Sequence, residues 1–297
     1  MYAETVTVTR QNLFDSDMLQ VGGFDARPAT DACSEVEWQP GHAVVLPFAG
    51  VFAKHDAPGR HVIGTPSHAV FFAPELPYRI GFPGAIGDRA LTLRFSGELA
   101  PEWLDRRGPD RLLPSAALLP GRAMVLRDLL RTRLASGAAD RLETEALSLE
   151  LLGVVLQSLR PAPRAATKLR HARAVERVKE AVALAPADNW SVARLARTAY
   201  LSPFHLCRVF RDMTGTSLHD YVVRERLAQS LDAVLDRAGN LTAIGLDAGF
   251  ASHSHFTARF RRFFGCTPAA LRQRMTTARR AEIRKIMTAA RSPSALD

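Results

Sequence analysis

Two stretches of the C-terminal half combine arginine, histidine and phenylalanine in the same order, and these side chains can contact phosphates and bases. The stretch "LSPFHLCRVFRDMTG" begins at Leu201, and "FASHSHFTARFRRFFG" begins at Phe250. Shifted by 50 positions, the two share five residues: Ser202/Ser252, His205/His255, Phe210/Phe260, Arg211/Arg261 and Gly215/Gly265. This self-similarity identifies an internal duplication, so each copy predicts one repeated structural unit.

Each copy predicts two short helices joined by a tight turn. In the first copy, Ser191 and Ser202 stand where N-cap residues are preferred, and Pro203 suits a first helical position. Gly215 ends the second helix, because glycine adopts the left-handed conformation readily. The expected buried faces consist of Val192, Leu195, Ala196 and Ala199 in the first copy and of Phe256, Phe260 and Phe263 in the second. The pattern is that of a helix-turn-helix, whose second helix can lie in the major groove of DNA.

The outward faces of the two second helices hold the candidates for DNA contact. The fork of Arg208 matches the O6 and N7 atoms of guanine, so this residue is the stronger base reader. Other arginines are placed to hold phosphates, which position the protein without specifying a sequence. The full candidate set is Phe204, His205, Cys207, Arg208, Arg211, His253, Ser254, Thr257, Arg259, Arg261 and Arg262.

The segment between the copies sets their spacing. "SLHDYVVRERLAQSLDAVLDRAG" predicts a helix of about 20 residues, which spans roughly 30 Å at 1.5 Å per residue. Major-groove segments on one side of B-DNA recur every ~34 Å. A rigid helix of this length can therefore hold two reading helices in adjacent grooves.

Charge and composition agree with a DNA-binding C-terminal part. The net charge is +9, with 23 Lys and Arg against 11 Asp and Glu in residues 161–297, and 16 against 19 in residues 1–160. A basic half attached to a mildly acidic half indicates that one half meets a polyanion. Three scattered cysteines, no secretory signal and no long apolar run favour a cytoplasmic protein with no membrane contact.

The N-terminal half predicts a different architecture. Residues 35–96 contain short runs rich in Val, Phe and Leu between turn sequences, which indicates an antiparallel sandwich or barrel. Residues 1–34 look irregular and are expected to form an arm that can close over a pocket. Leucines at three- and four-residue spacing predict helices at about 118–135 and 142–159.

The histidines of the N-terminal half raise the alternative that this half is an enzyme. His42, His55, His61 and His68 suggest a metal-binding cupin. Such a site needs a closely spaced His-x-His and a following Glu to converge on one ion, and none of these four histidines has that spacing. No catalytic constellation, metal site or cofactor is expected.

The duplicated region resembles a known family. "GFASHSHFTARFRRFFGCTPAALR" and the preceding "LARTAYLSPFHLCRVFRDMTGTSLHDYVVRERL" are similar to the DNA-binding domain of AraC/XylS-type bacterial transcription regulators. The resemblance implies two recognition helices in successive major grooves. It implies base reading by Phe204, Cys207 and Arg208 in the first helix, and by His253, Ser254 and position 258 in the second. The family often has arginine where Ala258 stands, so either Arg259 takes over or the second half-site is read weakly.

The N-terminal half resembles the cupin-like sensing domain of many such regulators through its strand pattern and the "FFAPELPYRI" hairpin. This resemblance implies a small-molecule effector of unidentified chemistry and a homodimer formed through the helices that follow. Candidate effector residues are His42, Phe52, His55 and Tyr78.

The expected fold is therefore α+β with two domains. It comprises a cupin-like antiparallel barrel (1–114), a helical dimerisation segment (115–160), a linker (161–170), a double helix-turn-helix domain (171–275) and a basic tail (276–297). The expected function is sequence-specific regulation of transcription through double-stranded DNA, with the effector changing promoter occupancy or contact with RNA polymerase. The alternatives are a non-specific DNA architectural protein and, further off, a cupin enzyme tethered by a DNA-binding domain.

Overall fold

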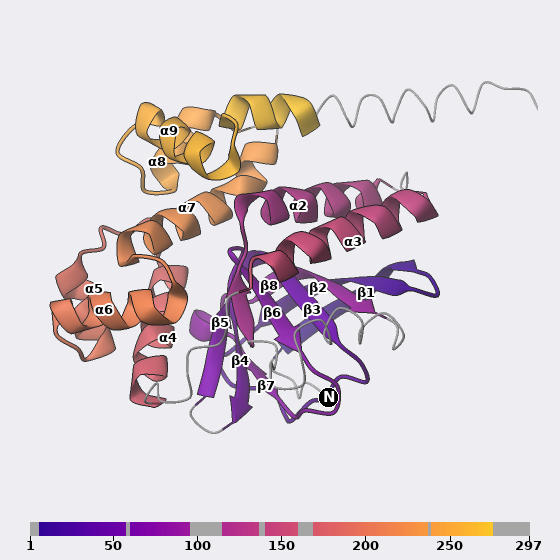
Figure 1. Ribbon diagram of the computed structural model, residues 1–297, viewed down its shortest axis with the longest axis horizontal. Helices are drawn as coiled ribbons and strands as arrows, with labels where there is room; N and C mark the ends of the chain where they lie inside the picture. Colours follow the sequence, from indigo (N-terminus) through magenta and orange to yellow (C-terminus); the bar gives the residue numbers. More distant parts are fainter. Residues whose placement is uncertain are drawn as a thin grey trace, which may run out of the picture.

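The computed structural model describes residues 6–57, 60–95, 115–136, 140–159, 169–236 and 239–275. These residues form two parts, as Figure 1 shows: N-terminal antiparallel sheets with two helices on one face, and a C-terminal group of helices. The expected α+β division is confirmed. The basic tail and most of the expected linker (161–168) lie outside the described residues.

The larger sheet has six strands, in the order β1-β2-β8-β3-β6-β9, and every neighbouring pair is antiparallel. Their bounds are β1 Val6–Asp15, β2 Leu19–Pro28, β3 Ala43–Gly50, β6 His68–Phe72, β8 Asp88–Phe95 and β9 Ala116–Leu118. Side chains alternate between its two faces, so strands such as β3 and β6 contribute to two different cores.

Two expectations for this region were wrong. The segment expected to be an irregular arm instead forms the β1–β2 hairpin, because β2 pairs with β8 along its whole length and buries Leu19 and Val21. The glycine pair that interrupts the apolar alternation of β2 hid this strand in the sequence. Ala116–Leu118 forms strand β9 and not the start of a helix, since it pairs with β6, and Pro120 then precedes the first helical residue.

The smaller sheet has three antiparallel strands, in the order β5-β4-β7. Their bounds are β4 Phe52–Ala57, β5 Arg60–Gly64 and β7 Arg79–Gly81, and a short 3-10 helix, η1 (Pro83–Ala85), follows. The two sheets pack against each other through a core that includes Phe52, Val70, Phe72 and Ile80. The described strands therefore form two facing sheets and not one closed barrel.

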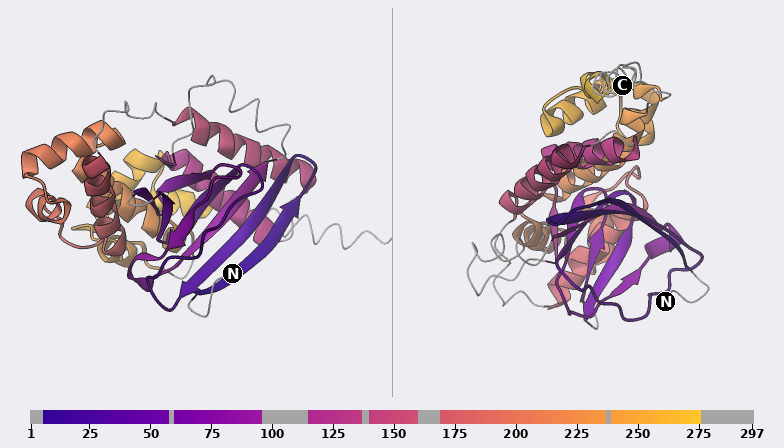
Figure 2. Two further views of the ribbon diagram at one scale, coloured as in Figure 1. Left: turned by 90° about the horizontal axis from the view of Figure 1, so that it is seen from below. Right: turned by 90° about the vertical axis from the view of Figure 1, so that its right-hand side faces the viewer.

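Helices α2 (Gly121–Ala135) and α3 (Arg141–Gln157) cover the opposite face of the six-stranded sheet. Asp140 caps α3 by accepting a hydrogen bond from the backbone N–H of Glu143 at 2.7 Å. Figure 2 shows these two helices as a layer, with the sheets on one side and α8 and α9 on the other.

The C-terminal part consists of six named helices. They are α4 Leu169–Leu184, α5 Val192–Ala199, α6 Pro203–Thr214, α7 Leu218–Leu235, α8 Leu241–Asp247 and α9 His253–Phe264, and residues 268–275 are helical as well. Within the described part of the chain, no helix has the length and apolar character needed to cross a membrane.

One apolar core joins the two parts of the molecule. Leu91 and Leu93 of β8 belong to the same buried cluster as Met124 of α2, Leu231 of α7 and Phe260 of α9. The first helix-turn-helix has its own core around Phe210 and Tyr221, and Leu118 of β9 packs against it. The second helix-turn-helix therefore shares one continuous core with the N-terminal part, while the first has a separate cluster that contacts that part.

Candidate DNA-binding surface

The first helix-turn-helix is built from α5 and α6. The hydroxyl of Ser202 accepts a hydrogen bond from the backbone N–H of His205 at 3.3 Å, Pro203 opens α6, and Gly215 ends it with a φ of 71°. The predicted caps of this helix are thus confirmed. Val192 was wrongly expected in the buried face of α5: its side chain is 43% exposed, because it occupies the first helical position, facing solvent.

The second helix-turn-helix, α8 and α9, repeats this construction. The hydroxyl of Ser252 accepts from the backbone N–H of His255 at 3.1 Å, and Gly265 ends α9. The turn requires glycine at Gly249, which has a φ of 84° and where an added Cβ would lie 2.6 Å from the carbonyl oxygen of Ala187. Duplicated caps and turns therefore hold α6 and α9 in equivalent positions.

The outward face of α6 is open to solvent. Phe204 is 80% exposed, and Cys207, Arg208 and Arg211 are also exposed. His205 is half-buried, since its Nε2 lies 3.2 Å from the Nε2 of His171 in α4, and its Nδ1 lies 3.2 Å from a guanidinium nitrogen of Arg208. The imidazole therefore contacts the guanidinium end of the Arg208 side chain.

On α9, most of the candidates are also exposed. His253, Ser254, Ala258, Arg261 and Arg262 are exposed, and Thr257 is half-buried with its hydroxyl 3.4 Å from His253 Nε2. Within the described residues, none of the exposed arginines Arg208, Arg211, Arg261 and Arg262 belongs to an ion pair. Their charges are available to a polyanion.

Arg259 takes a different direction from its neighbours. Its Nε donates to His255 Nε2 at 3.3 Å, and another of its nitrogens lies 3.5 Å from His219 Nε2 at the start of α7. The side chain is thus half-buried between α9 and α7, beside the exposed methyl group of Ala258. At position 258, α9 therefore presents a methyl group, and the Arg259 side chain beside it is held by two histidines.

Helix α7 connects the two units and is 18 residues long, which corresponds to about 27 Å. Ser217 caps it by accepting from the backbone N–H of Asp220 at 3.1 Å. Near its C-terminal end, the Arg272 guanidinium donates to the carbonyl oxygen of Val234 at 2.7 Å and thereby holds the helix after α9 against α7. The two recognition helices are therefore mounted on one straight support.

A pocket with a volume of about 70 Å³, partly open to solvent, lies between the two sheets of the N-terminal part. Of the four candidate effector residues, Phe52 and Tyr78 line this pocket, whereas His42 and His55 are not among its lining residues. The lining is formed by Arg10, Phe24, Glu37, Gln39, Val45, Phe52, Phe72, Tyr78, Ile80, Asp88, Thr92 and Arg94. The lining residues of β1 and β2 were not predicted from the sequence, because the first hairpin was not assigned.

The N-terminal histidines do not converge on one point. His55 lies 3.5 Å from the sulfur of Cys33, and its ring centroid is 5.3 Å from that of His61. His68 lies at the contact between the two parts of the molecule. In the part of the chain that the structure describes, no group of three or more His, Cys, Asp or Glu residues could hold a metal ion.

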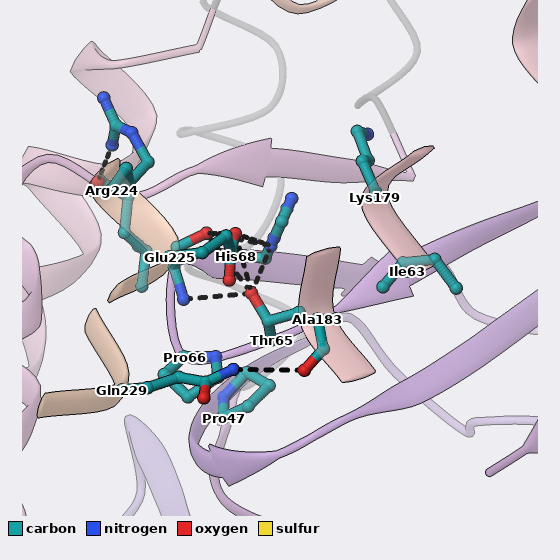
Figure 3. A network of polar contacts seen from close by, with 12 residues as sticks. Pro47, Ile63, Thr65, Pro66, His68, Lys179, Ala183, Arg224, Glu225 and Gln229 are labelled. Atoms are coloured by element: carbon teal, nitrogen blue, oxygen red, sulfur yellow. Dashed lines mark hydrogen bonds and ion pairs between the residues drawn. The ribbon is translucent and has the colours of Figure 1, made fainter. Parts of the chain in front are cut away.

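The two parts meet at a buried polar contact, which Figure 3 shows. The hydroxyls of Thr65 and Ser67, in the turn between β5 and β6, both donate to Oε1 of Glu225 in α7, and the Thr65 bond measures 3.2 Å. His68 Nδ1 lies 2.8 Å from the Thr65 hydroxyl. Burial raises the pKa of Glu225 and lowers the pKa of His68 well below its usual value, so the contact forms without a buried charged histidine.

Further bonds surround this contact. The backbone N–H of Ile63 donates to the Glu176 carboxylate of α4 at 2.9 Å, and Gln229 of α7 donates to the carbonyl oxygen of Ala183 in α4 at 3.3 Å. Arg131 of α2 donates to Asp232 of α7 at 2.7 Å. The only sequence signal for this interface was Glu225, a carboxylate on the apolar side of a helix.

Two capped helix-turn-helix units on one connecting helix, with unpaired arginines on their open faces, define a DNA-binding protein. Comparisons agree with this class. The sequence profile described as "Helix-turn-helix domain" matches residues 195–274. The chain is 25% identical over 225 residues to the probable transcriptional regulator LumQ of Photobacterium leiognathi, covering 71% of this chain and 84% of that protein.

It is also 33% identical over 89 residues to the probable transcription factor PqrA of Proteus vulgaris, covering 30% of this chain and 73% of that protein. Among solved structures, the DNA-binding domain of AdpA in complex with a target DNA is 28% identical, with a TM-score of 0.32, and covers 35% of this chain and 96% of that chain. The chain belongs to the AraC family of transcription regulators, which bind DNA sequence-specifically.

We predict that Arg208→Ala and Arg211→Ala separate base reading from phosphate holding. Binding sites are selected from random duplex DNA with the full chain at physiological salt, and each variant is then measured on the selected site and on single-base substitutions of it. Arg208→Ala should relax preference at one base position, because a bidentate arginine–guanine pair contributes ~1–3 kcal/mol of discrimination. Arg211→Ala should weaken binding to all sequences alike. It should also reduce by about one the magnitude of the slope of the logarithm of the binding constant against the logarithm of the salt concentration.

The matched pair makes the outcome specific, since both arginines are exposed on the same helix. Uniform weakening by both variants would contradict base reading by Arg208. Failure of the parent protein to enrich any sequence would favour the architectural alternative.

Proposed function

We propose that this chain is an effector-responsive regulator that reads two successive major-groove segments with α6 and α9. The observation that carries the proposal is the mounting of both recognition helices on α7, which is about 27 Å long and docked on the N-terminal part. Contact with RNA polymerase belongs to the same proposal, because an occupied promoter site places the regulator beside the polymerase.

The N-terminal part is proposed as the effector sensor. Two facing antiparallel sheets around a pocket support a relation to the cupin-like sensing domains, in an opened form. Strand β8 gives this pocket a route to the DNA-binding part. Its residues Asp88, Thr92 and Arg94 line the pocket, while the alternate residues Leu91 and Leu93 belong to the core shared with α7 and α9.

An effector acts on DNA binding only if it favours one arrangement of the two parts over another. The contact between the Thr65–His68 turn and Glu225 is suited to this coupling, because a buried carboxyl needs its hydrogen bonds. A shift of the turn that removes the donors leaves the acceptor unsatisfied, which costs about 1–3 kcal/mol. Small displacements of β5 and β6 therefore change the docking equilibrium strongly.

The double variant Thr65→Val/Ser67→Ala tests this coupling. It removes both hydroxyl donors to Glu225 and should weaken docking by about 1–3 kcal/mol. Amide hydrogen exchange in the Thr65–His68 turn and in α7 should rise by roughly tenfold to a hundredfold, and affinity for the selected DNA site should fall as the second helix-turn-helix loses support from α2.

Adding Glu225→Leu to the double variant provides the control. With donors and acceptor all replaced by apolar groups, no unsatisfied carboxylate remains and only His68 Nδ1 loses its hydroxyl partners, so exchange should return part of the way toward that of the parent protein. Parent-like exchange and DNA affinity in the double variant would show that docking does not govern DNA binding.

Homodimerisation through α3 is also proposed. Leu142 (76% exposed), Ala146, Leu149 and Gly153 follow one another at intervals of four, three and four residues on the accessible side of this helix. This is the spacing of a coiled-coil seam. An added Cβ at Gly153 would meet no atom within 4 Å, which leaves room for a second helix.

The variant Leu142→Glu/Leu149→Glu should convert a dimer to a monomer in sedimentation equilibrium at micromolar concentration, because four like charges then face one another across the seam. Leu142→Met/Leu149→Met keeps the apolar volume and should leave the dimer intact. A monomeric parent protein, or a dimer that tolerates the glutamates, would exclude α3 as the interface.

A further inference from the structure

The pocket between the sheets contains acidic groups that the protein itself does not satisfy. Asp88, at the start of β8, is only 4% exposed, and its Oδ1 has no hydrogen-bond partner among the described residues. Glu37 contributes a second such atom, Oε1, while its Oε2 lies 4.0 Å from Arg10. Both residues line the pocket. Buried acceptors without donors are costly, so each is a place where a ligand donor gains a full hydrogen bond.

The cations of the pocket are engaged with the protein. Arg94 donates to Gln20 Oε1 at 3.1 Å, and Arg10 lies with its guanidinium 5.5 Å from the ring centroid of Phe24 and beside Glu37. Lys54, close behind Phe72, is paired with Asp56 at 2.6 Å. Among the described residues, Asp88 Oδ1 and Glu37 Oε1 therefore remain the acceptors of the pocket without a hydrogen-bond donor.

The remaining lining combines the polar side chains of Gln39, Tyr78 and Thr92 with apolar walls, and Gln39 donates to the Tyr78 hydroxyl at 2.8 Å. Phe24, Val45, Phe52, Phe72 and Ile80 come from both sheets and form the walls. A ligand that fits this lining has a compact apolar body and a strongly donating polar end, because an apolar body gains contact with the rings and a polyhydroxylated one does not. An ammonium group donates three hydrogen bonds and forms charge-assisted bonds to carboxylates, which are about twice as strong as neutral ones.

We propose that the effector is a small primary amine with an apolar body, whose ammonium group is bound by Asp88, with Glu37 as a second acceptor. The proposal rests on the assignment of this pocket as the effector site. It goes beyond that assignment by stating the ligand class and the residue that selects it.

The protonation of Asp88 gives the proposal a distinctive signature. Burial, with a smaller contribution from the nearby Asp25, raises the pKa of Asp88 to about 8 in the empty pocket. The other charged groups facing the pocket are Glu37, Arg10 and Arg94. At pH 7 the carboxyl is mainly protonated, so an incoming ammonium must displace its proton. Binding therefore releases a proton and weakens by about tenfold for each pH unit below 8.

Isothermal titration calorimetry of the full chain without DNA tests this, with 2-phenylethylamine as the probe. Its matched controls are 2-phenylethanol, which keeps the body and one neutral donor, and phenylacetate, which carries the opposite charge. We expect the amine to bind at least tenfold more tightly than either control at pH 8. Titrations at pH 7 in buffers of different ionisation enthalpy should show the release of close to one proton.

The variant Asp88→Asn should reduce the affinity for the amine at least tenfold and abolish its pH dependence. It imitates the neutral carboxyl, so its thermal unfolding at pH 7 should match that of the parent protein. Should the variant fail to fold, the proton release by the parent protein and the effect of Glu37→Gln, expected at threefold or more, still decide the question.

Absent binding of the amine, equal or tighter binding of the alcohol or the acid, or binding without proton release would each overturn the proposal. Because no DNA is present in these titrations, such a result leaves sequence-specific DNA binding untouched. Selection of DNA sites by the same protein preparation tests that activity separately.

Discussion

The burial of Glu225 against the hydroxyls of Thr65 and Ser67 is the interaction on which the arrangement of the molecule depends. A carboxyl that is fully buried needs its hydrogen bonds, and both donors come from the other part of the chain. The contact therefore fixes how α7 lies on the sheets. Because α7 also carries the first and second helix-turn-helix at its two ends, this one contact orients both recognition helices at once.

The shared apolar core makes the two helix-turn-helix units unequal. Phe256 and Phe260 pack in the cluster that also holds Leu93 of β8 and Met124 of α2, whereas Phe210 packs in a separate cluster that Leu118 of β9 contacts. Both units therefore contact the N-terminal part, the second through a shared core. The two outward faces also differ, because Ala258 is exposed on α9 and Arg259 is held by histidines. We propose that α6 contributes more to sequence specificity than α9.

The sequence predicted the C-terminal part well because its signals are local. Serine caps, Pro203 and the glycines that end α6 and α9 each act within four residues, so the helix bounds follow from the chain alone. The outward faces of the recognition helices follow from helical periodicity for the same reason. Their roles in reading bases and holding phosphates stay predictions.

The fold of the N-terminal part was harder to predict from the sequence, because its strands are defined by pairing between distant residues. Strand β2 forms by pairing with β8, and its glycines interrupt the apolar alternation that would have predicted it. Ala116–Leu118 is a strand only because it pairs with β6. The pocket depends on the first of these errors, because Arg10 and Phe24 could not be placed in it without the first hairpin. Likewise, Glu225 contacts Thr65, which lies 160 residues away in the sequence, and no local pattern predicts such a contact.

The proposed function requires that α7, held by the N-terminal part, keeps the two recognition helices at a fixed distance and orientation. Its most direct test is the affinity of the full chain for duplexes in which zero to ten base pairs are inserted between the two selected motifs. A rigid support predicts tight binding at one spacing only, with a loss of at least tenfold for a single inserted pair, because each pair moves the second motif by ~3.4 Å and rotates it around the axis. Similar affinity across several spacings would contradict the claim and show that the two units bind independently.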